Sequence, residues 1–345
     1  MPHPGPRPLP LFLDLVRSET AGDGDGLARA MAGLRAYQDA ARVRERPERR
    51  IVARAGRACL REIGGVGPPV VFVPSLINPP DVLDLSPTAS LLGWLAEERG
   101  FRTLLVDWGS PDPAERSRDI GAHVTNLLLP LLASLDEAPV LVGYCLGGTM
   151  AIAGANLVEA RGVGLIAAPW HFSGFGTAAT EMVALWRGAE PACDALGLVP
   201  MEVLQAGFWR LDPQRTVAKF QRFGGLDPAS REAAEFVALE DWANGGAPLT
   251  YAAGRQLFED FIGTDDPGGS RWTVGGRIVS PDAIGCPAVE FVSLTDRIVP
   301  AATAIGLADR RDLNAGHVGM VMGSRARAQL WKPLADWLSE QVGPI

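Results

Sequence analysis

The sequence contains few cysteines and few histidines, and this scarcity excludes several kinds of site. Its 345 residues include four cysteines and four histidines, and no two cysteines form a Cys-x-x-Cys pair. Disulfide frameworks and zinc modules need closely spaced ligands of this kind. We therefore expect neither of them, and no bound metal or cofactor, in a protein that resides in a reducing compartment.

Long apolar runs and an excess of positive charge are also missing. The most apolar run, Leu127–Leu135, is interrupted by Pro130 and is far shorter than the roughly 20 residues that span a bilayer. The apolar stretch Leu9–Val16 is broken by Pro10 and Asp14 and has no cleavage site of a signal peptide. A net charge of −8 supplies no positive field for nucleic acid. The sequence thus predicts a soluble, cytoplasmic protein with no membrane span and no nucleic-acid partner.

Prolines and glycines are concentrated at the N-terminus. Five of the first ten residues are proline, and residues 21–26 read Ala-Gly-Asp-Gly-Asp-Gly. Such composition is typical of extended or turn-rich chain. We predict a Pro/Gly-rich tail over residues 1–26, followed by a helix over residues 27–42.

From residue 51 onward, short apolar segments alternate with segments of helical periodicity. Candidate strands are Ile51–Ala55, Cys59–Ile63, Val70–Val73, Thr103–Asp107, Val140–Val142, Val163–Ala167, Val289–Leu294 and Leu307–Leu313. Alternating strands and helices predict an α/β fold with a mostly parallel sheet covered by helices on both faces. The close spacing of the first two strands favours an antiparallel edge.

The alternation stops between residues 168 and 282. This segment is helix-like and rich in tryptophan, with Trp170, Trp186, Trp209, Trp242 and Trp272. It is inserted after the sixth strand, where it would cover the carboxyl ends of the strands, the edge at which open α/β sheets bind ligands. The sequence predicts a helical cap over residues 168–282 and a core formed by residues 27–167 and 283–345.

The motif Gly143-Tyr-Cys-Leu-Gly-Gly148 follows a short apolar strand and precedes a helical segment. Small residues around one nucleophile, in a strand–turn–helix setting, are typical of the nucleophile elbow of α/β-hydrolases, here with Cys145 in place of serine. A helix N-terminus also stabilises a thiolate. The motif predicts Cys145 as a nucleophile; the alternative is a buried structural cysteine in a tight turn.

A base and an orienting carboxylate follow in the order of the α/β-hydrolases. His317 lies in a glycine-flanked loop after the last strand, and Asp296 ends the strand before it. Among the other histidines, His3 lies in the tail, while His123 and His171 are expected to be structural. We predict that Asp296 orients His317; the alternative is an aspartate that caps a turn, and Asp282 is the next candidate carboxylate.

Backbone N–H groups would bind the oxyanion. The N–H of Leu146, directly after the nucleophile, is one predicted donor. The other is expected from the loop after the third strand, at Leu76 or Ile77. A cysteine nucleophile converts one thioester into another and so preserves the activation of the acyl group, which favours acyl transfer from a CoA-type thioester.

Several segments together resemble the polyhydroxyalkanoate synthases over roughly residues 50–340. They are Asn78–Trp108, Gly109–Asp112, Gly143–Gly148, Leu239–Trp242, Thr295–Pro300 and Gly316–Gly319. The resemblance implies an α/β-hydrolase fold with a helical cap and a Cys145–His317–Asp296 triad. The chain departs from the family pattern at Leu146, where the two-subunit synthases usually carry glutamine, and at Arg297, where many members have histidine.

The resemblance also implies a reaction and partners. It implies polymerisation of (R)-3-hydroxyacyl-CoA into polyester, with a covalent thioester intermediate and release of CoA. The short chain is most like the catalytic subunit of two-subunit synthases, which implies a homodimer, a second synthase subunit, or both, in the cytoplasm or at the surface of polyester granules. The alternatives are a cysteine-dependent thioesterase or esterase and a catalytically idle, granule-binding subunit.

Overall fold

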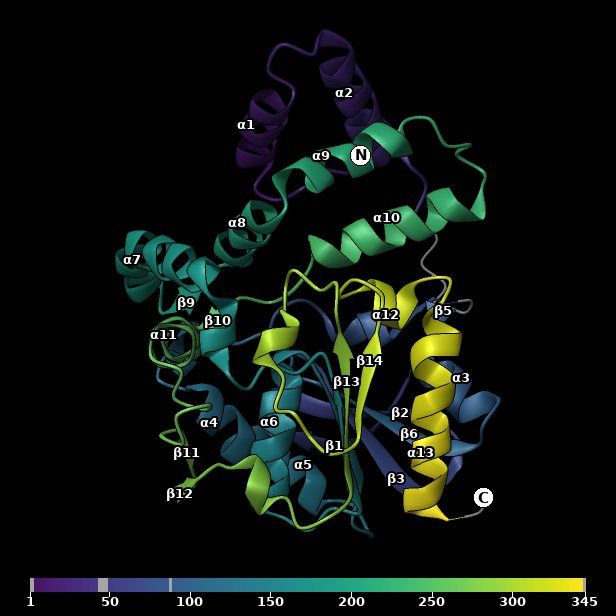
Figure 1. Ribbon diagram of the computed structural model, residues 1–345, viewed down its shortest axis with the longest axis vertical. Coiled ribbons are helices and arrows are strands. Elements are labelled where there is room, and N and C mark those ends of the chain that lie inside the picture. The colour runs from purple at the N-terminus through teal and green to yellow at the C-terminus, as the bar shows by residue number, and fades with distance from the viewer. Residues whose placement is uncertain (1–2, 43–48, 87–88, 344–345) are drawn as a thin grey trace.

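The computed structural model describes residues 3–42, 49–86 and 89–343. Within these residues, one eight-stranded sheet has the order β1-β2-β6-β3-β7-β8-β13-β14 (Figure 1). Its strands are β1 (Arg50–Ala55), β2 (Ala58–Gly64), β3 (Val66–Val73), β6 (Phe101–Asp107), β7 (Val140–Tyr144), β8 (Gly162–Ile166), β13 (Ala288–Ser293) and β14 (Arg310–Leu313). All eight correspond to strands predicted from the sequence.

The pairing of the strands confirms a mostly parallel sheet with an antiparallel edge. β1 pairs antiparallel with β2, and β2 pairs antiparallel with β6. From β6 through β3, β7, β8 and β13 to β14 every pair is parallel. The carboxyl ends of β3, β7, β13 and β14 therefore meet at one edge, where the loops that follow them come together.

Helices cover both faces of the sheet because the strand side chains alternate between two apolar clusters. Val71 and Val73 of β3 belong to one cluster, and Val70 and Phe72 belong to the other. Buried residues of α4 (Ile120–His123), α5 (Leu129–Ala133) and α6 (Leu146–Ala155) complete the first cluster. Those of α3 (Leu91–Glu97), α12 (Gly319–Met322) and α13 (Lys332–Val342) complete the second.

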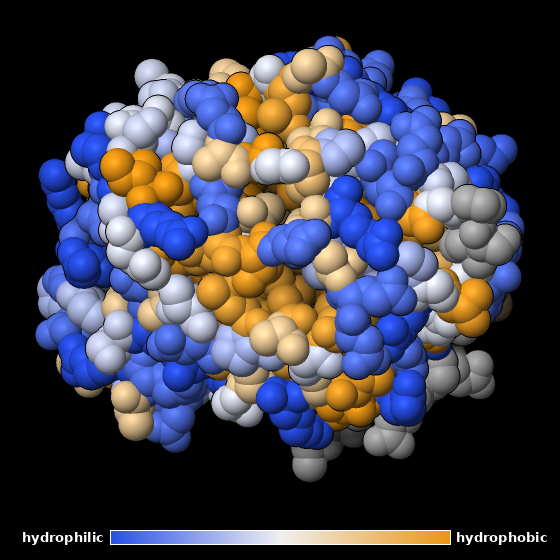
Figure 2. Space-filling view, turned by 90° about the horizontal axis from the view of Figure 1, so that it is seen from below, coloured by the Kyte–Doolittle hydropathy of each residue, from blue (hydrophilic) through white to orange (hydrophobic). Residues whose placement is uncertain are grey.

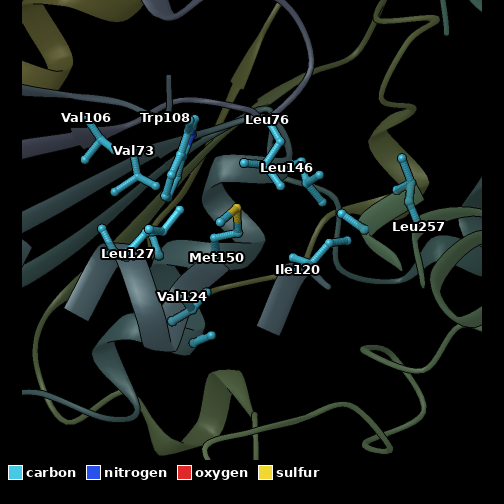
Figure 3. Close-up of a cluster of buried hydrophobic side chains, with 14 of the residues drawn as sticks. Val73, Leu76, Val106, Trp108, Ile120, Val124, Leu127, Leu146, Met150 and Leu257 are labelled. Atoms are coloured by element: carbon cyan, nitrogen blue, oxygen red, sulfur yellow. The ribbon is translucent and has the colours of Figure 1, made fainter. Parts of the chain in front are cut away.

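The start of α6 is anchored in the first cluster. Figure 3 shows Leu146 and Met150 of α6 in this cluster together with Leu76 and Trp108. The indole of Trp108 also donates a hydrogen bond to the carbonyl oxygen of Pro74 at 3.0 Å. The loop after β3 and the first turn of α6 are thus held against the same apolar side chains.

A helical cap follows β8, the sixth strand of the sheet, as predicted. Figure 1 shows its helices above the carboxyl edge of the sheet. They are α7 (Thr177–Leu196), α8 (Met201–Leu211), α9 (Pro213–Phe223), α10 (Arg231–Ala243), α11 (Tyr251–Arg255) and the π-helical segment η5 (Gln256–Gly263). Two short two-stranded pairs lie in the same insertion: β9 (Leu198–Val199) with β10 (Leu249–Thr250), and β11 (Thr273–Val274) with β12 (Arg277–Ile278). A third short pair, β4 (Asp84–Ser86) with β5 (Ala89–Ser90), precedes α3 in the core.

The surface at the end opposite to the cap is of mixed polarity. Figure 2 shows apolar side chains near the middle of this face, with polar side chains around them. In the part of the chain that the structure describes, no helix combines the length and the apolar character needed to cross a membrane.

The N-terminal segment differs from the sequence prediction. Residues 9–19 form α1 (Leu9–Glu19), and α2 (Gly24–Asp39) begins three residues earlier than expected. The predicted tail over residues 1–26 is therefore wrong for these residues. Pro10 lies in the first turn of α1, where its missing N–H is not needed, and Asp23 caps α2 by accepting a hydrogen bond from the N–H of Gly26 at 2.8 Å.

Burial explains why this proline-rich segment is ordered. Phe12 of α1 and Tyr37 of α2 are fully buried against Trp209 and Phe220 of the cap. Burial of an aromatic side chain contributes about 1.5–3 kcal/mol. The phenol of Tyr37 also donates a hydrogen bond to Asp241 of α10 at 2.6 Å. The N-terminal hairpin, α1 and α2, is thus part of the cap assembly, on the side away from the sheet (Figure 1).

Candidate active site

Cys145 lies at the sharp turn between β7 and α6. Its φ of 56° and ψ of −134° lie outside the regions that L-residues prefer, a conformation that costs about 1–3 kcal/mol. Its N–H donates to the carbonyl oxygen of Ile166 in the next strand at 2.9 Å. The surrounding structure therefore fixes the turn and holds Cys145 at the N-terminus of α6.

Glycines around Cys145 allow three segments to meet closely. A Cβ atom on Gly147 would lie 2.1 Å from the carbonyl oxygen of Val73, and one on Gly143 would lie 2.3 Å from the Cα atom of Gly148. Both distances are far shorter than a van der Waals contact. The small residues that mark the motif in the sequence are thus required by the packing of α6 onto β3 and β7.

Asp296 and His317 lie together beside Cys145, as the order of the motifs predicted. His317 Nδ1 is 2.6 Å from Asp296 Oδ2. The other carboxylate oxygen, Oδ1, accepts hydrogen bonds from the N–H groups of Ile298 at 2.7 Å and Val299 at 3.0 Å. These two bonds fix the carboxylate, and the carboxylate in turn fixes the orientation of the imidazole.

The environment of His317 favours its protonated form. Burial is the largest influence and favours the neutral ring, but the Asp296 carboxylate and the Cys145 sulfur, with their hydrogen bonds to the ring, raise the pKa of His317 to about 10. An imidazole with this pKa carries a positive charge at neutral pH. This charge lies beside the sulfur of Cys145.

Tyr144, which precedes the nucleophile, supports His317 from the end of β7. Its ring stacks on the imidazole with centroids 5.0 Å apart, and its hydroxyl donates to the carbonyl oxygen of His317 at 3.3 Å. Burial, followed by the negative charges of Cys145 and Asp296, raises the pKa of Tyr144 well above its ordinary value. The phenol therefore stays neutral and able to donate its proton.

The loop after β3 contains the two residues predicted as the source of the second oxyanion donor, Leu76 and Ile77. The N–H of Ile77 donates to the hydroxyl of Ser75 at 3.1 Å, and Leu76 is buried in the core. Both Ser75 and Ile77 line the cavity that contains Cys145. Leu146 is the first residue of α6, so its N–H has no acceptor within the helix. Ser75 is a polar group of the site that sequence reasoning missed, because any serine in a proline-rich turn could as well stabilise the turn.

A cavity of about 580 Å³ lies between the cap and the carboxyl edge of the sheet. Cys145, Asp296 and His317 line it from the sheet side. Most of its wall is apolar and comes from the cap helices, including Phe172, Phe175, Met182, Phe208, Phe236, Trp242 and Phe258. The candidate nucleophile thus opens into an apolar space of the size that small-molecule sites have.

The remaining histidines and the alternative carboxylate do not line this cavity. His123 is buried elsewhere, with Nε2 at 2.8 Å from Arg57 Nη2, and burial followed by the charges of Arg57 and Arg118 lowers its pKa to about 3. His171 and Asp282 are also absent from the lining residues. Across the described ranges of the chain, no three His, Cys, Asp or Glu side chains gather in a way that could hold a metal ion.

The sequence is similar to curated polyester polymerase subunits. The chain is 27% identical to a poly(3-hydroxyalkanoate) polymerase subunit PhaC of Haloferax mediterranei over 79% of this chain and 59% of the relative. It is 25% identical to the PhaC subunits of Synechocystis sp. and Allochromatium vinosum, over 79% of this chain and 78% and 81% of those chains. The chain thus spans less than two thirds of the length of the Haloferax mediterranei relative. No family model matches it.

Solved structures identify the fold. A candidate aryl esterase from Burkholderia cenocepacia superposes with a TM-score of 0.51 at 14% identity, covering 86% of this chain and 100% of that one. A candidate non-heme bromoperoxidase, BpoC of Mycobacterium tuberculosis, gives 0.51 at 16% identity, covering 86% and 99%. The chain therefore has the α/β-hydrolase fold, and its sequence is similar to those of the poly(3-hydroxyalkanoate) polymerase subunits PhaC.

Proposed function

We propose that the chain transfers (R)-3-hydroxyacyl groups from CoA thioesters to the hydroxyl end of a growing polyester. The observation that carries this proposal is a cysteine, in place of serine, beside an aspartate-held imidazole in an apolar cavity. The names of the homologous polymerase subunits support the choice of reaction and substrate.

The first half of the reaction loads the enzyme. The Cys145 thiolate attacks the thioester carbonyl, and the N–H of Leu146, with a donor from the Ser75–Ile77 loop, stabilises the oxyanion. The bond between the carbonyl carbon and the CoA sulfur breaks. The CoA thiolate takes the proton of the His317 imidazolium and leaves as a thiol, and the acyl group stays on Cys145 as a thioester.

The second half transfers the acyl group. Neutral His317 accepts the proton of the hydroxyl at the end of the polyester while that oxygen attacks the Cys145 thioester. An ester bond forms, the bond to sulfur breaks, and the Cys145 thiolate is regenerated beside the imidazolium. The reaction needs no cofactor, because the thioester supplies the activation.

The apolar wall favours a polyester acceptor over water. A polyester chain has little charge and buries apolar surface when it occupies the cavity, whereas water gains little there. The side chain of Asp296 is fully buried and that of His317 is 7% exposed. Competing hydrolysis of the Cys145 thioester is therefore restricted by the access of water.

A combined assay of both products tests the proposal. The purified chain is incubated with (R)-3-hydroxybutyryl-CoA, and free CoA and the acyl product are measured together, with Cys145→Ala as the matched control. We expect CoA release and polymer from the wild type and neither from the variant. Free hydroxy acid in place of polymer would identify a thioesterase, and the absence of CoA release would identify an idle subunit.

We extend the proposal to the partners of the chain. The relatives are named as subunits of a polymerase, which supports a second subunit or a second copy of this chain as partner. A polyester product supports a location at the surface of polyester granules in the cytoplasm. Co-sedimentation of the chain with granules, before and after a salt wash, tests this location.

A further inference from the structure

One wall of the cavity carries positive charges that the reaction described above does not use. Arg215, Lys219 and Arg222 of α9 all line the cavity. They are spaced four and three residues apart and therefore share one face of the helix. Arg215 and Arg222 lie roughly 10 Å apart along the helix axis. The positively charged face of α9 thus borders the cavity over two helical turns.

The three cations differ in their ion pairs with neighbouring carboxylates. Lys219 is neutralised by Glu240, with Nζ at 2.7 Å from Oε1. Arg215 and Arg222, in contrast, have no ion-pair partner among the residues that the structure describes. Both side chains are exposed to solvent. An exposed arginine fork at the rim of a cavity can bind an anion without a large desolvation penalty.

Arg215 lies next to the catalytic loop. A Cβ atom added to Gly316, the residue before His317, would lie 3.9 Å from Arg215 Nη1 and 4.0 Å from Nη2. The neighbouring Arg297 is already paired with Asp212, at 2.9 Å. Arg215, which has no ion-pair partner among the described residues, therefore lies at the His317 side of the cavity.

The neighbouring helix α10 contributes negative charge to the lining. Glu232 and Glu235 of α10 line the cavity, and among the described residues Glu235 is paired with Arg231 at 2.6 Å. An anionic ligand would be repelled from α10 and attracted to α9. The charges of the two helices thus favour α9 over α10 as the place where an anion binds.

We infer that Arg215 and Arg222 bind the phosphate groups of the substrate's CoA, so that acyl-CoA enters along α9. This inference rests on the proposed function. The long pantetheine arm of CoA separates its phosphates from the thioester, so the phosphates can stay at the exposed rim while the thioester reaches Cys145. Arginine recognises phosphate through two parallel hydrogen bonds.

A comparison of two thioesters tests the inference. (R)-3-Hydroxybutyryl-CoA carries phosphates, and the N-acetylcysteamine thioester of the same acid does not. We expect Arg215→Gln/Arg222→Gln to raise KM for the CoA substrate about tenfold or more, with little change in kcat. The KM for the N-acetylcysteamine thioester should stay unchanged. Added salt should raise KM for the CoA substrate more strongly in the wild type than in the double variant.

Arg210→Gln is the matched control. Arg210 lies in the last turn of α8, as Arg222 does in α9, and it is exposed, but it does not line the cavity. Its substitution removes the same charge from the cap and should leave both KM values unchanged. An equal rise in KM for both thioesters in the double variant, or no rise for either, would overturn the inference.

Direct binding separates this inference from the proposed function. Calorimetric titration with free CoA needs no turnover. We expect the wild type and Arg210→Gln to bind CoA, and the double variant to bind it about tenfold more weakly or worse. Absence of CoA binding by the wild type would contradict the inference even if the N-acetylcysteamine thioester reacts. Arginine-dependent binding without CoA release would support the phosphate site while contradicting the acyltransferase.

Discussion

At the scale of single residues, the site depends on one thiol in a strained turn. Cys145 and Cys286 are both partly exposed, whereas Cys59 and Cys193 are buried. Burial raises the pKa of Cys286, and only Cys145 has the His317 imidazolium beside it. Chemical reactivity should therefore distinguish two cysteines of similar exposure.

We expect a mild alkylating agent to modify Cys145 faster than Cys286, because alkylation requires the thiolate. Peptide mapping after brief labelling, with and without substrate thioester, measures the two rates. Substrate should protect Cys145 and leave Cys286 unaffected. Faster labelling of Cys286, or labelling of Cys145 that substrate does not slow, would rule out Cys145 as the nucleophile.

Replacement of Asp296 should show whether its carboxylate orients the His317 imidazole or only contributes to folding. We expect Asp296→Asn to lower the rate of CoA release on the order of a hundredfold or more, because the amide favours the wrong tautomer of His317. Asp282→Asn is the control, since the Asp282 side chain is exposed and does not line the cavity. A wild-type rate in Asp296→Asn, with circular dichroism unchanged in both variants, would transfer the orienting role to another group.

The raised pKa of His317 should also make stability depend on pH. A group whose pKa rises from 6.5 to about 10 on folding stabilises the fold below pH 6.5 and loses this contribution as the pH rises through 10. We therefore expect the stability difference between the wild type and His317→Gln to shrink between pH 7 and 10. Urea unfolding at several pH values measures it.

His123→Gln is the control for this pH dependence. The pKa of His123 is lowered to about 3, so its contribution is present above pH 6.5 and is lost only as the pH falls toward 3. The difference between the wild type and His123→Gln should stay constant between pH 7 and 10. Parallel pH profiles for the two histidine variants would contradict the charged state assigned to His317.

At the scale of elements, the N-terminal hairpin and the cap helices form one packed unit. A Cβ atom on Gly33 of α2 would lie 1.9 Å from the backbone oxygen of Phe220 in α9. Arg42 adds an ion pair with Asp241 of α10 at 3.1 Å. The position of α9, and of the charged face that borders the cavity, therefore depends on the close approach of α2.

Gly33→Ala should loosen this contact. We expect it to destabilise the protein by about 1–3 kcal/mol, because α2 must move away from α9, and to speed proteolysis within the hairpin. Gly24→Ala, in the same helix but with open space around the added methyl, should be neutral or slightly stabilising. Equal melting temperatures for the two variants would show that the hairpin does not pack on α9 as described.

The ion pair between Arg297 and Asp212 connects the cap to the loop that carries Asp296. Arg297 follows Asp296 directly, and Asp212 is the N-cap of α9, where it also accepts a hydrogen bond from the N–H of Arg215 at 3.2 Å. The pair gives a structural reason for arginine where many synthases have histidine. Sequence reasoning missed it because the two residues are 85 positions apart.

At the scale of the whole molecule, the cap covers the site and would have to move during the proposed reaction. The side chains of Asp296 and His317 are almost fully buried, while the proposed product is a long polymer. We expect the isolated monomer to polymerise (R)-3-hydroxybutyryl-CoA only after a lag, which a partner subunit or higher protein concentration shortens by opening the cap. CoA release from a chain shown to be monomeric, with no lag at any concentration, would contradict this requirement.

The sequence by itself determined which segments form the strands of a mostly parallel sheet, the position of the cap and the residues of the candidate triad. These features are local or ordered along the chain: apolar strands such as Val140–Val142, the small residues around Cys145, and polar residues that directly follow strands. Because the carboxyl ends of parallel strands meet at one edge, chain order alone predicted that Asp296 and His317 would lie near Cys145.

Only the tertiary structure decided the features that depend on distant contacts. The N-terminal segment is helical because Phe12 and Tyr37 find an apolar surface on α8 and α9, which its proline-rich composition does not reveal. The hydroxyl of Ser75, the stacking of Tyr144 on His317 and the pairing of Arg297 with Asp212 likewise arise from packing. The same holds for the two arginines of α9, which have no ion-pair partner among the described residues. Whether a charged side chain is paired depends on the neighbours that folding brings close to it.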